Sequence, residues 1–86
     1  MKPDKLLARL LAGQVANVAF EDILRLVCAL GFVMDRISGS QHIARHCELA
    51  IKLNLQPDRS GDAKPYQVRL LIAIIHEFNL HLDGGR

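Results

Sequence analysis

The sequence predicts an α+β domain in which a three-stranded antiparallel sheet carries helices on one face. The chain of 86 residues is too short for two independent hydrophobic cores. Apolar residues recur at helical spacing near both ends of the chain, whereas the middle alternates between apolar and polar residues as strands do. The resulting order of elements, helix, helix, strand, strand, strand, helix, favours a two-layer sandwich of helices on a sheet.

Two helices are expected before the first strand. The first begins after Pro3 and ends before Gly13, and the second has Asn17 as its N-cap and ends before Gly31. Each carries one apolar stripe, which is the pattern of a helix that packs on one side. The expected division of the chain is a helical extension with its linker (1–16), a main domain (17–82) and a tail (83–86).

Three strands are expected next, at 32–37, 41–46 and 49–55, and the first two form a hairpin through a turn at 38–40. Alternation along the strands predicts which side chains share a face of the sheet.

By this alternation, Ile43 should lie on the core side with the leucines of the third strand. His42 should then lie on the opposite, open face with Lys52 and Asn54. Strand alternation also allows Arg45 a place at the core-side edge of its strand. These assignments make His42 an exposed histidine beside the turn.

The last helix is expected from Pro65 to about Asn79. It is apolar on more than one side, so the side away from the sheet needs a cover. The first helix is the nearest candidate and a second protomer is the alternative. If the first helix is the cover, its Leu7, Leu10 and Leu11 should be buried near Leu70 and Ile74.

Composition narrows the class of protein. Half of the residues are hydrophobic and 23% are charged, so the chain should fold. Cys28 and Cys47 show no CxxC spacing, which favours a reducing compartment over a disulfide framework. The first 14 residues match neither a signal peptide nor a membrane span. We therefore expect a cytoplasmic protein with no membrane association.

Chemistry is concentrated between Ser38 and His46. His42 can give or take a proton near neutral pH, and Gly39 and Ser40 leave backbone N–H groups free to approach a phosphate. A plain surface histidine is the commoner interpretation of such a residue. His42 and His46 lie roughly 13 Å apart along a strand, so no metal site is predicted.

Charge gives a weaker indication of the partner. Between positions 36 and 69 the chain has six basic residues and three acidic ones, although its net charge is only +2. This bias suits a phosphate-bearing partner, while a solvated surface of mixed charge is the commoner explanation.

Three stretches resemble the HicA toxin family, the small ribonucleases of toxin–antitoxin pairs. They are "GSQHIARH", "LNLQP" and "KPYQVRLLIAIIHEFNL", and the similarity runs from about Asn17 to Leu80. The resemblance implies a double-stranded-RNA-binding-domain-like fold and a metal-independent endoribonuclease without a cofactor. It also implies mRNA as the substrate and neutralisation by a HicB-like antitoxin protein.

By the same resemblance, His42 is the catalytic histidine, and Gly39 and Ser40 form the turn that presents it. Lys52 and Arg45 are expected to contact RNA phosphate. The chain departs from the family at Gln41, where many members have a first histidine, and at Cys47–Glu48, where members often have proline after "RH". A non-catalytic RNA-binding domain and an assembly module with no nucleic-acid role remain the alternatives.

Overall fold

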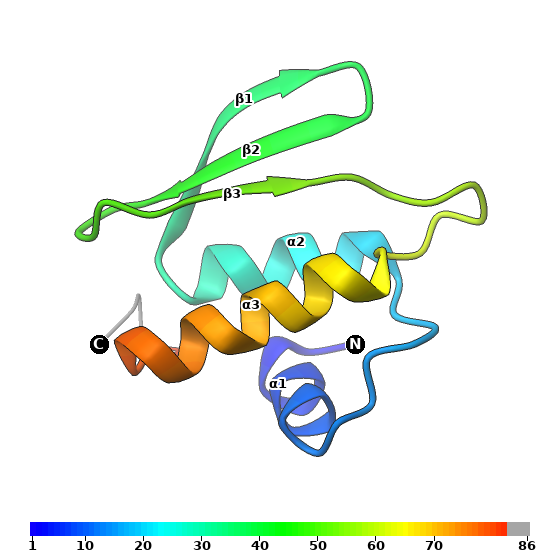
Figure 1. The fold of residues 1–86 in the computed structure, drawn as a ribbon, viewed down its shortest axis with the longest axis horizontal. Helices are drawn as coiled ribbons and strands as arrows, with labels where there is room; N and C mark the ends of the chain where they lie inside the picture. The colour runs from blue at the N-terminus through cyan, green and yellow to red at the C-terminus, as the bar shows by residue number, and fades with distance from the viewer. Residues whose placement is uncertain (83–86) are drawn as a thin grey trace.

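The computed structural model describes residues 1–82 and shows a three-stranded antiparallel sheet with three helices (Figure 1). The strands lie in the order β1-β2-β3, so each pairs with its neighbour in sequence. This confirms the predicted class and element order, while the expected tail at 83–86 lies outside the described residues. The elements are α1 (Pro3–Leu11), α2 (Phe20–Ala29), β1 (Phe32–Ser38), β2 (Gln41–His46), β3 (Lys52–Leu55) and α3 (Pro65–Phe78).

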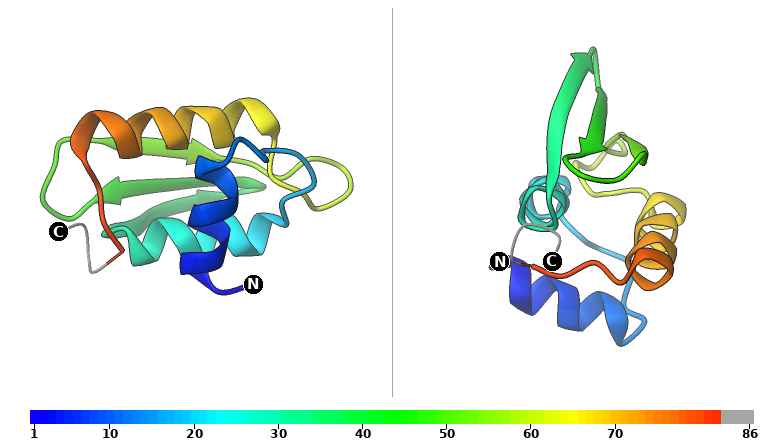
Figure 2. Two further views of the ribbon diagram at one scale, coloured as in Figure 1. Left: turned by 90° about the horizontal axis from the view of Figure 1, so that it is seen from below. Right: turned by 90° about the vertical axis from the view of Figure 1, so that its left-hand side faces the viewer.

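The helices form two layers beneath the sheet. Helices α2 and α3 run side by side under one face of it, with their N-terminal ends at the same end of the molecule (Figures 1 and 2). Helix α1 crosses below both of them, on the side away from the sheet. The opposite face of the sheet carries no helix of the described part. Across residues 1–82, no helix combines the length and apolar character needed to span a bilayer.

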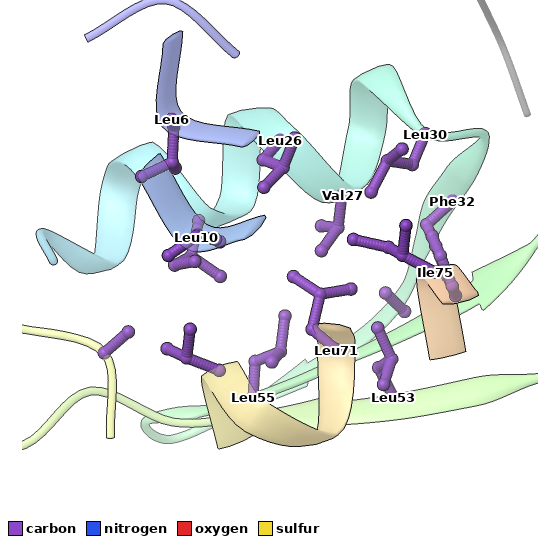
Figure 3. Close-up of a cluster of buried hydrophobic side chains, with 14 of the residues drawn as sticks. Leu6, Leu10, Leu26, Val27, Leu30, Phe32, Leu53, Leu55, Leu71 and Ile75 are labelled. Atoms are coloured by element: carbon purple, nitrogen blue, oxygen red, sulfur yellow. The ribbon is translucent and has the colours of Figure 1, made fainter. Parts of the chain in front are cut away.

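The core lies between the sheet and the α2–α3 layer and continues to α1. Leu26 and Val27 of α2 and Leu30, which caps its C-terminal end, pack with Leu71 of α3 and Leu53 of β3, all at 1% exposure or less (Figure 3). Each such aliphatic side chain contributes about 1.5–3 kcal/mol by leaving water. The core therefore holds the helix layer rigidly against β2 and β3.

Helix α1 covers the other helices differently from the expectation. Leu10 is buried as predicted, and so is Leu6, but Leu7 is only partly buried and Leu11 is 48% exposed. Leu70 of α3 is also 52% exposed. The reason is the crossing direction: α1 lies across α2 and α3 rather than along α3, so its inner stripe packs against both helices (Figure 2). The predicted cap exists, but it does not cover the whole outer side of α3.

The start of α2 corrects a second expectation. Asn17 is not the N-cap, because the helix begins at Phe20 after Ala19, and Asn17 has a left-handed φ of 58° in the preceding turn. Backbone pairing replaces the expected side-chain cap. The Phe20 N–H donates to the carbonyl of Gly61 (3.0 Å), and the Ala63 N–H donates to that of Val18 (2.7 Å). The loop before α3 thereby holds the start of α2.

The faces of the sheet are the reverse of those predicted for β2. In an antiparallel pair, residues directly opposite each other share a face. His42 is opposite the buried Leu55, so it lies on the helix side, whereas Ile43 is opposite Asn54 on the open face. The adjacent residues Ile43 and Ala44 of this strand are both apolar, so alternation alone could not show which of them faces the helices. The fully buried Ala44 shows which parity packs against the helices.

Candidate functional site

His42 lies on the helix side of the sheet, at the end of the molecule where α2 begins. Its ring packs edge-on against the ring of Phe20, the first residue of α2, with centroids 4.9 Å apart and planes at 67°. The side chain is partly buried, and Ile37 is its partner across the hairpin. His42 is thus not the freely exposed residue of the open face that alternation predicted. Phe20 fixes where the ring lies.

One ring nitrogen of His42 is hydrogen-bonded to the backbone. Nδ1 lies 3.0 Å from the carbonyl oxygen of Ser40. A carbonyl only accepts hydrogen bonds, so Nδ1 must carry the proton in this contact. In a neutral ring the lone pair then resides on Nε2. This is the tautomer that a proton acceptor working through Nε2 requires.

The turn that carries Ser40 is tight and has its own support. Ser38 pairs with Gln41, so the loop is the two residues Gly39 and Ser40. Gly39 has φ +60°, as the first central position of a type II′ turn requires, and a Cβ there would meet open space. Conformation, not crowding, therefore favours glycine. The Ser40 hydroxyl accepts a hydrogen bond from Gln56 Nε2 at 3.0 Å.

A buried amide continues this support into α3. The Gln56 backbone N–H donates to Gln67 Oε1 at 2.9 Å, and Gln67 Nε2 lies 3.4 Å from the hydroxyl of Tyr66. Gln67 is only 8% exposed although it is polar. Phe20, Gln56 and Gln67 were not predicted from the sequence to be part of the site. The sequence did carry one signal for Gln67, since this polar residue stands beside Val68 on the buried stripe of the last helix.

Arg45 and Lys52 form a separate cluster on the open face of the sheet. They are partners across β2 and β3, and both approach Asp35, at 3.7 Å from Arg45 Nε and 3.9 Å from Lys52 Nζ. Asp35 lies at the irregularity of β1. Lys52 was expected to share a face with His42, and this is wrong. The alternative place for Arg45, at the core side of its strand, is wrong as well.

His46 is the most buried polar residue near the site and has a structural environment. It is 3% exposed, its Nε2 lies 3.1 Å from the carbonyl oxygen of Leu30, and its Nδ1 accepts from the N–H groups of Glu48 (3.1 Å) and Leu49 (3.2 Å). Both nitrogens are therefore occupied in the neutral ring. Within residues 1–82, no three histidine, cysteine or acidic side chains are grouped so that they could hold a metal ion.

The loop between β3 and α3 is held by one carboxylate. Asp58 accepts hydrogen bonds from the hydroxyl of Ser60 (2.7 Å) and from the backbone N–H groups of Ser60 (2.8 Å) and Asp62 (3.0 Å). The Ser60 hydroxyl, followed by the backbone donors, lowers the pKa of Asp58 below its ordinary value. This folded loop is what brings Gly61 and Ala63 against the start of α2.

No protein-family model matches the chain, and no curated protein or solved structure matches it either. The resemblance to the HicA family therefore depends on the three quoted stretches, and the geometry around His42 is the independent observation that bears on function.

Proposed function

We propose that this chain is an endoribonuclease of the HicA type, a toxin that cleaves mRNA and is held inactive by a HicB-like antitoxin. His42 is the proton acceptor. The observation that carries the proposal is the contact of His42 Nδ1 with the Ser40 carbonyl, which leaves the lone pair of a neutral ring on Nε2. The side chain is partly exposed at the end of the sheet, where a substrate can reach it.

RNA brings its own nucleophile, so one well-placed base can begin the reaction. Nε2 of His42 takes the proton of a 2′-hydroxyl, and the 2′ oxygen forms a bond to the adjacent phosphorus. The bond from phosphorus to the 5′ oxygen breaks, and that oxygen takes a proton from water or from the protonated ring. The products are a 2′,3′-cyclic phosphate and a 5′-hydroxyl. No metal or cofactor takes part in the proposed reaction.

The substrate should approach the end of the molecule that carries the hairpin turn and the N-terminal ends of α2 and α3 (Figure 1). Approach across the open face would not bring one RNA phosphate to both His42 and the basic pair, because Lys52 and Arg45 lie on the other side of the sheet from His42. At the turn, the backbone of Gly39 and Ser40 is the proposed contact for RNA phosphate.

The positive charge for binding RNA beside His42 comes from the N-terminal end of helix α3, because the basic residues of the open face lie on the other side of the sheet. Its first turn has no acidic residue and Lys64 precedes it, whereas the first turn of α2 contains Glu21 and Asp22. The N-terminal end of a helix favours anions, and Lys64 adds to this effect. Tyr66 is 61% exposed beside it and is available for stacking on a base. We propose Lys64 and Tyr66 as RNA contacts.

The arrangement of the sheet with α2 and α3 supports the family fold. The α-β-β-β-α order and two helices on one face of the sheet are what a double-stranded-RNA-binding-domain-like fold requires. The finer assignment to that fold is part of the proposal.

A non-catalytic RNA-binding domain is the second candidate. The observation that favours it is the environment of His42, whose ring contacts a backbone carbonyl and the aromatic ring of Phe20. Neither group can supply a second proton or a charge.

The test is cleavage of a defined RNA by purified protein in the presence of EDTA. We expect fragments that end in a 2′,3′-cyclic phosphate and no cleavage at a nucleotide whose 2′-hydroxyl is replaced by hydrogen. The His42→Ala protein, purified identically, controls for contaminating ribonucleases. Intact RNA together with salt-sensitive RNA binding would support the second candidate, and absence of both would remove RNA as the substrate.

A further inference from the structure

Resting on the proposed function, the structure points to a positioning residue that the family resemblance does not supply. We propose that the side chain of Gln56 holds the Ser40 peptide in place and thereby sets the tautomer of His42. Gln56 follows β3, sixteen positions from Ser40 in the sequence, and its side chain is hydrogen-bonded to that serine.

The first step is the contact between Gln56 and the turn. Gln56 Nε2 donates to Ser40 Oγ at 3.0 Å, and the carbonyl oxygen of the same serine accepts from His42 Nδ1 at 3.0 Å. A two-residue turn with Gly39 at φ +60° can rock about its peptide planes, since glycine adopts several backbone conformations readily. The amide of Gln56 limits this motion from the side.

The second step is what holds Gln56 itself. Its backbone N–H donates to Oε1 of Gln67 at 2.9 Å, and Gln67 is 8% exposed in the first turn of α3. Gln67 is flanked by Val68, which is buried in the core. The side chain of Gln56 therefore begins from a backbone that is fixed to a rigid helix. Removing that side chain beyond Cβ leaves the backbone contact in place.

The third step is the consequence for His42. A histidine in water populates both neutral tautomers, and the hydrogen bond at one nitrogen decides which is present. With the Ser40 carbonyl fixed, the proton stays on Nδ1. If the carbonyl moves, the Nε2–H form becomes populated, and that form has no lone pair on the nitrogen that must accept the 2′-hydroxyl proton. Gln56 thus acts on the reaction without touching RNA.

The tautomer can be measured without any substrate, by long-range ¹H–¹⁵N correlation of the imidazole nitrogens at mildly alkaline pH, where an ordinary imidazole is neutral. The chain has four histidines, and the His42→Ala spectrum assigns the signals of His42 by difference. His46 provides an internal standard. Its Nε2 contacts the Leu30 carbonyl and its Nδ1 accepts, so it should show the opposite tautomer in every variant.

We expect wild-type His42 to be almost entirely in the Nδ1–H form and Gln56→Ala to contain a substantial Nε2–H fraction. Gln56→Glu should restore the wild-type tautomer, because the Ser40 hydroxyl can reverse its role and donate to a carboxylate. Asn54→Ala is the matched control: it removes an exposed amide from β3 on the opposite face and should change nothing.

Kinetics give a second readout where the wild type cleaves RNA. In Gln56→Ala, kcat should fall in proportion to the Nδ1–H fraction, about tenfold if that form drops to a tenth. KM should be unchanged, and Gln56→Glu should recover kcat.

Two results would overturn the inference: a mixed or Nε2–H tautomer for His42 in the wild type, or an unchanged tautomer in folded Gln56→Ala. If Gln56→Ala does not fold, Ser40→Ala removes the same contact from the other side and must give the same shift. Failure of RNA cleavage would reject the proposed function but leave the tautomer result intact. His42-dependent cleavage with an unchanged tautomer would reject only the positioning role.

Discussion

The two histidines of β2 show how one residue type takes two roles on one face of a strand. His42 and His46 both point toward the helices, with Ala44 between them. His46 is 3% exposed and bonds through both ring nitrogens to backbone groups of Leu30, Glu48 and Leu49. His42 is partly exposed and is bonded through Nδ1 to Ser40. Both ring nitrogens of His46 are hydrogen-bonded to the backbone, whereas within residues 1–82 the ring of His42 has a hydrogen bond at Nδ1 alone.

The difference arises from what each end of the strand meets. At the His46 end, the close of α2 and the β2–β3 connection bring backbone groups to both sides of the ring. At the His42 end, the start of α2 presents the apolar ring of Phe20, and the turn presents a single carbonyl. A histidine is therefore a candidate for chemistry when the fold orients it without consuming both of its nitrogens.

Under the proposed function, the largest expected effect is the loss of toxicity in His42→Ala. Removing a proton acceptor should reduce RNA cleavage by about 10²–10⁴-fold and abolish growth arrest on induction in a bacterium. The contact with Phe20 also contributes to folding, so we expect a stability loss of about 1 kcal/mol. Growth curves at matched expression and thermal unfolding measure the two quantities. Growth arrest equal to that of the wild type would remove His42 from the mechanism.

The next effect in size is the destabilisation of His46→Ala. The substitution leaves the Leu30 carbonyl and the N–H groups of Glu48 and Leu49 without their partner in a buried place, and it leaves a cavity beside Phe32. We expect a loss of about 3 kcal/mol of unfolding free energy.

Denaturant unfolding measures the stability of His46→Ala, and cleavage by its remaining folded fraction should be near that of the wild type. A His46→Ala protein that is as stable as the wild type but inactive would contradict the structural role assigned to His46.

Local rules predicted much of the fold because they act within a few residues. Pro65 begins α3 and Asn79 ends it in a left-handed conformation, as expected for these residue types. The hairpin at Gly39–Ser40 is also where the sequence places it. The prediction that Asn17 caps the start of α2 was wrong, because backbone groups of a loop about forty residues further along the chain hold that end of the helix.

The site was predicted less completely, for the same physical reason. His42 was found by its type and its turn, but its face depends on the register with β3, which puts it opposite Leu55. The support from Gln56 and Gln67 requires three segments to meet in space, and no spacing within one segment encodes that.

A smaller effect on stability, without a change in RNA cleavage, should show that helix α1 does not contribute to the site. Leu10→Ala removes a fully buried side chain of α1, so the unfolding free energy should fall by about 2–3 kcal/mol. Leu11→Ala is the matched control, since Leu11 is 48% exposed and should cost less than about 1 kcal/mol. RNA cleavage by either folded variant should equal that of the wild type. A selective loss of cleavage in Leu10→Ala at full stability would mean that α1 acts on the site.

The smallest expected effect is on the salt dependence of RNA affinity, and it indicates which face of the protein binds RNA. In the cleavage-dead His42→Ala protein, RNA affinity should decrease with salt through release of condensed counterions. Lys64→Gln should flatten the salt slope by roughly one contact, because Lys64 precedes α3 at the end that carries the turn. Lys52→Gln should flatten it by only a fraction of that amount, since Lys52 lies on the opposite face from His42 and approaches Asp35 at 3.9 Å. Fluorescence anisotropy over a range of salt concentrations measures both slopes. The reverse ranking would put the RNA on the open face of the sheet and leave His42 too far from it to act.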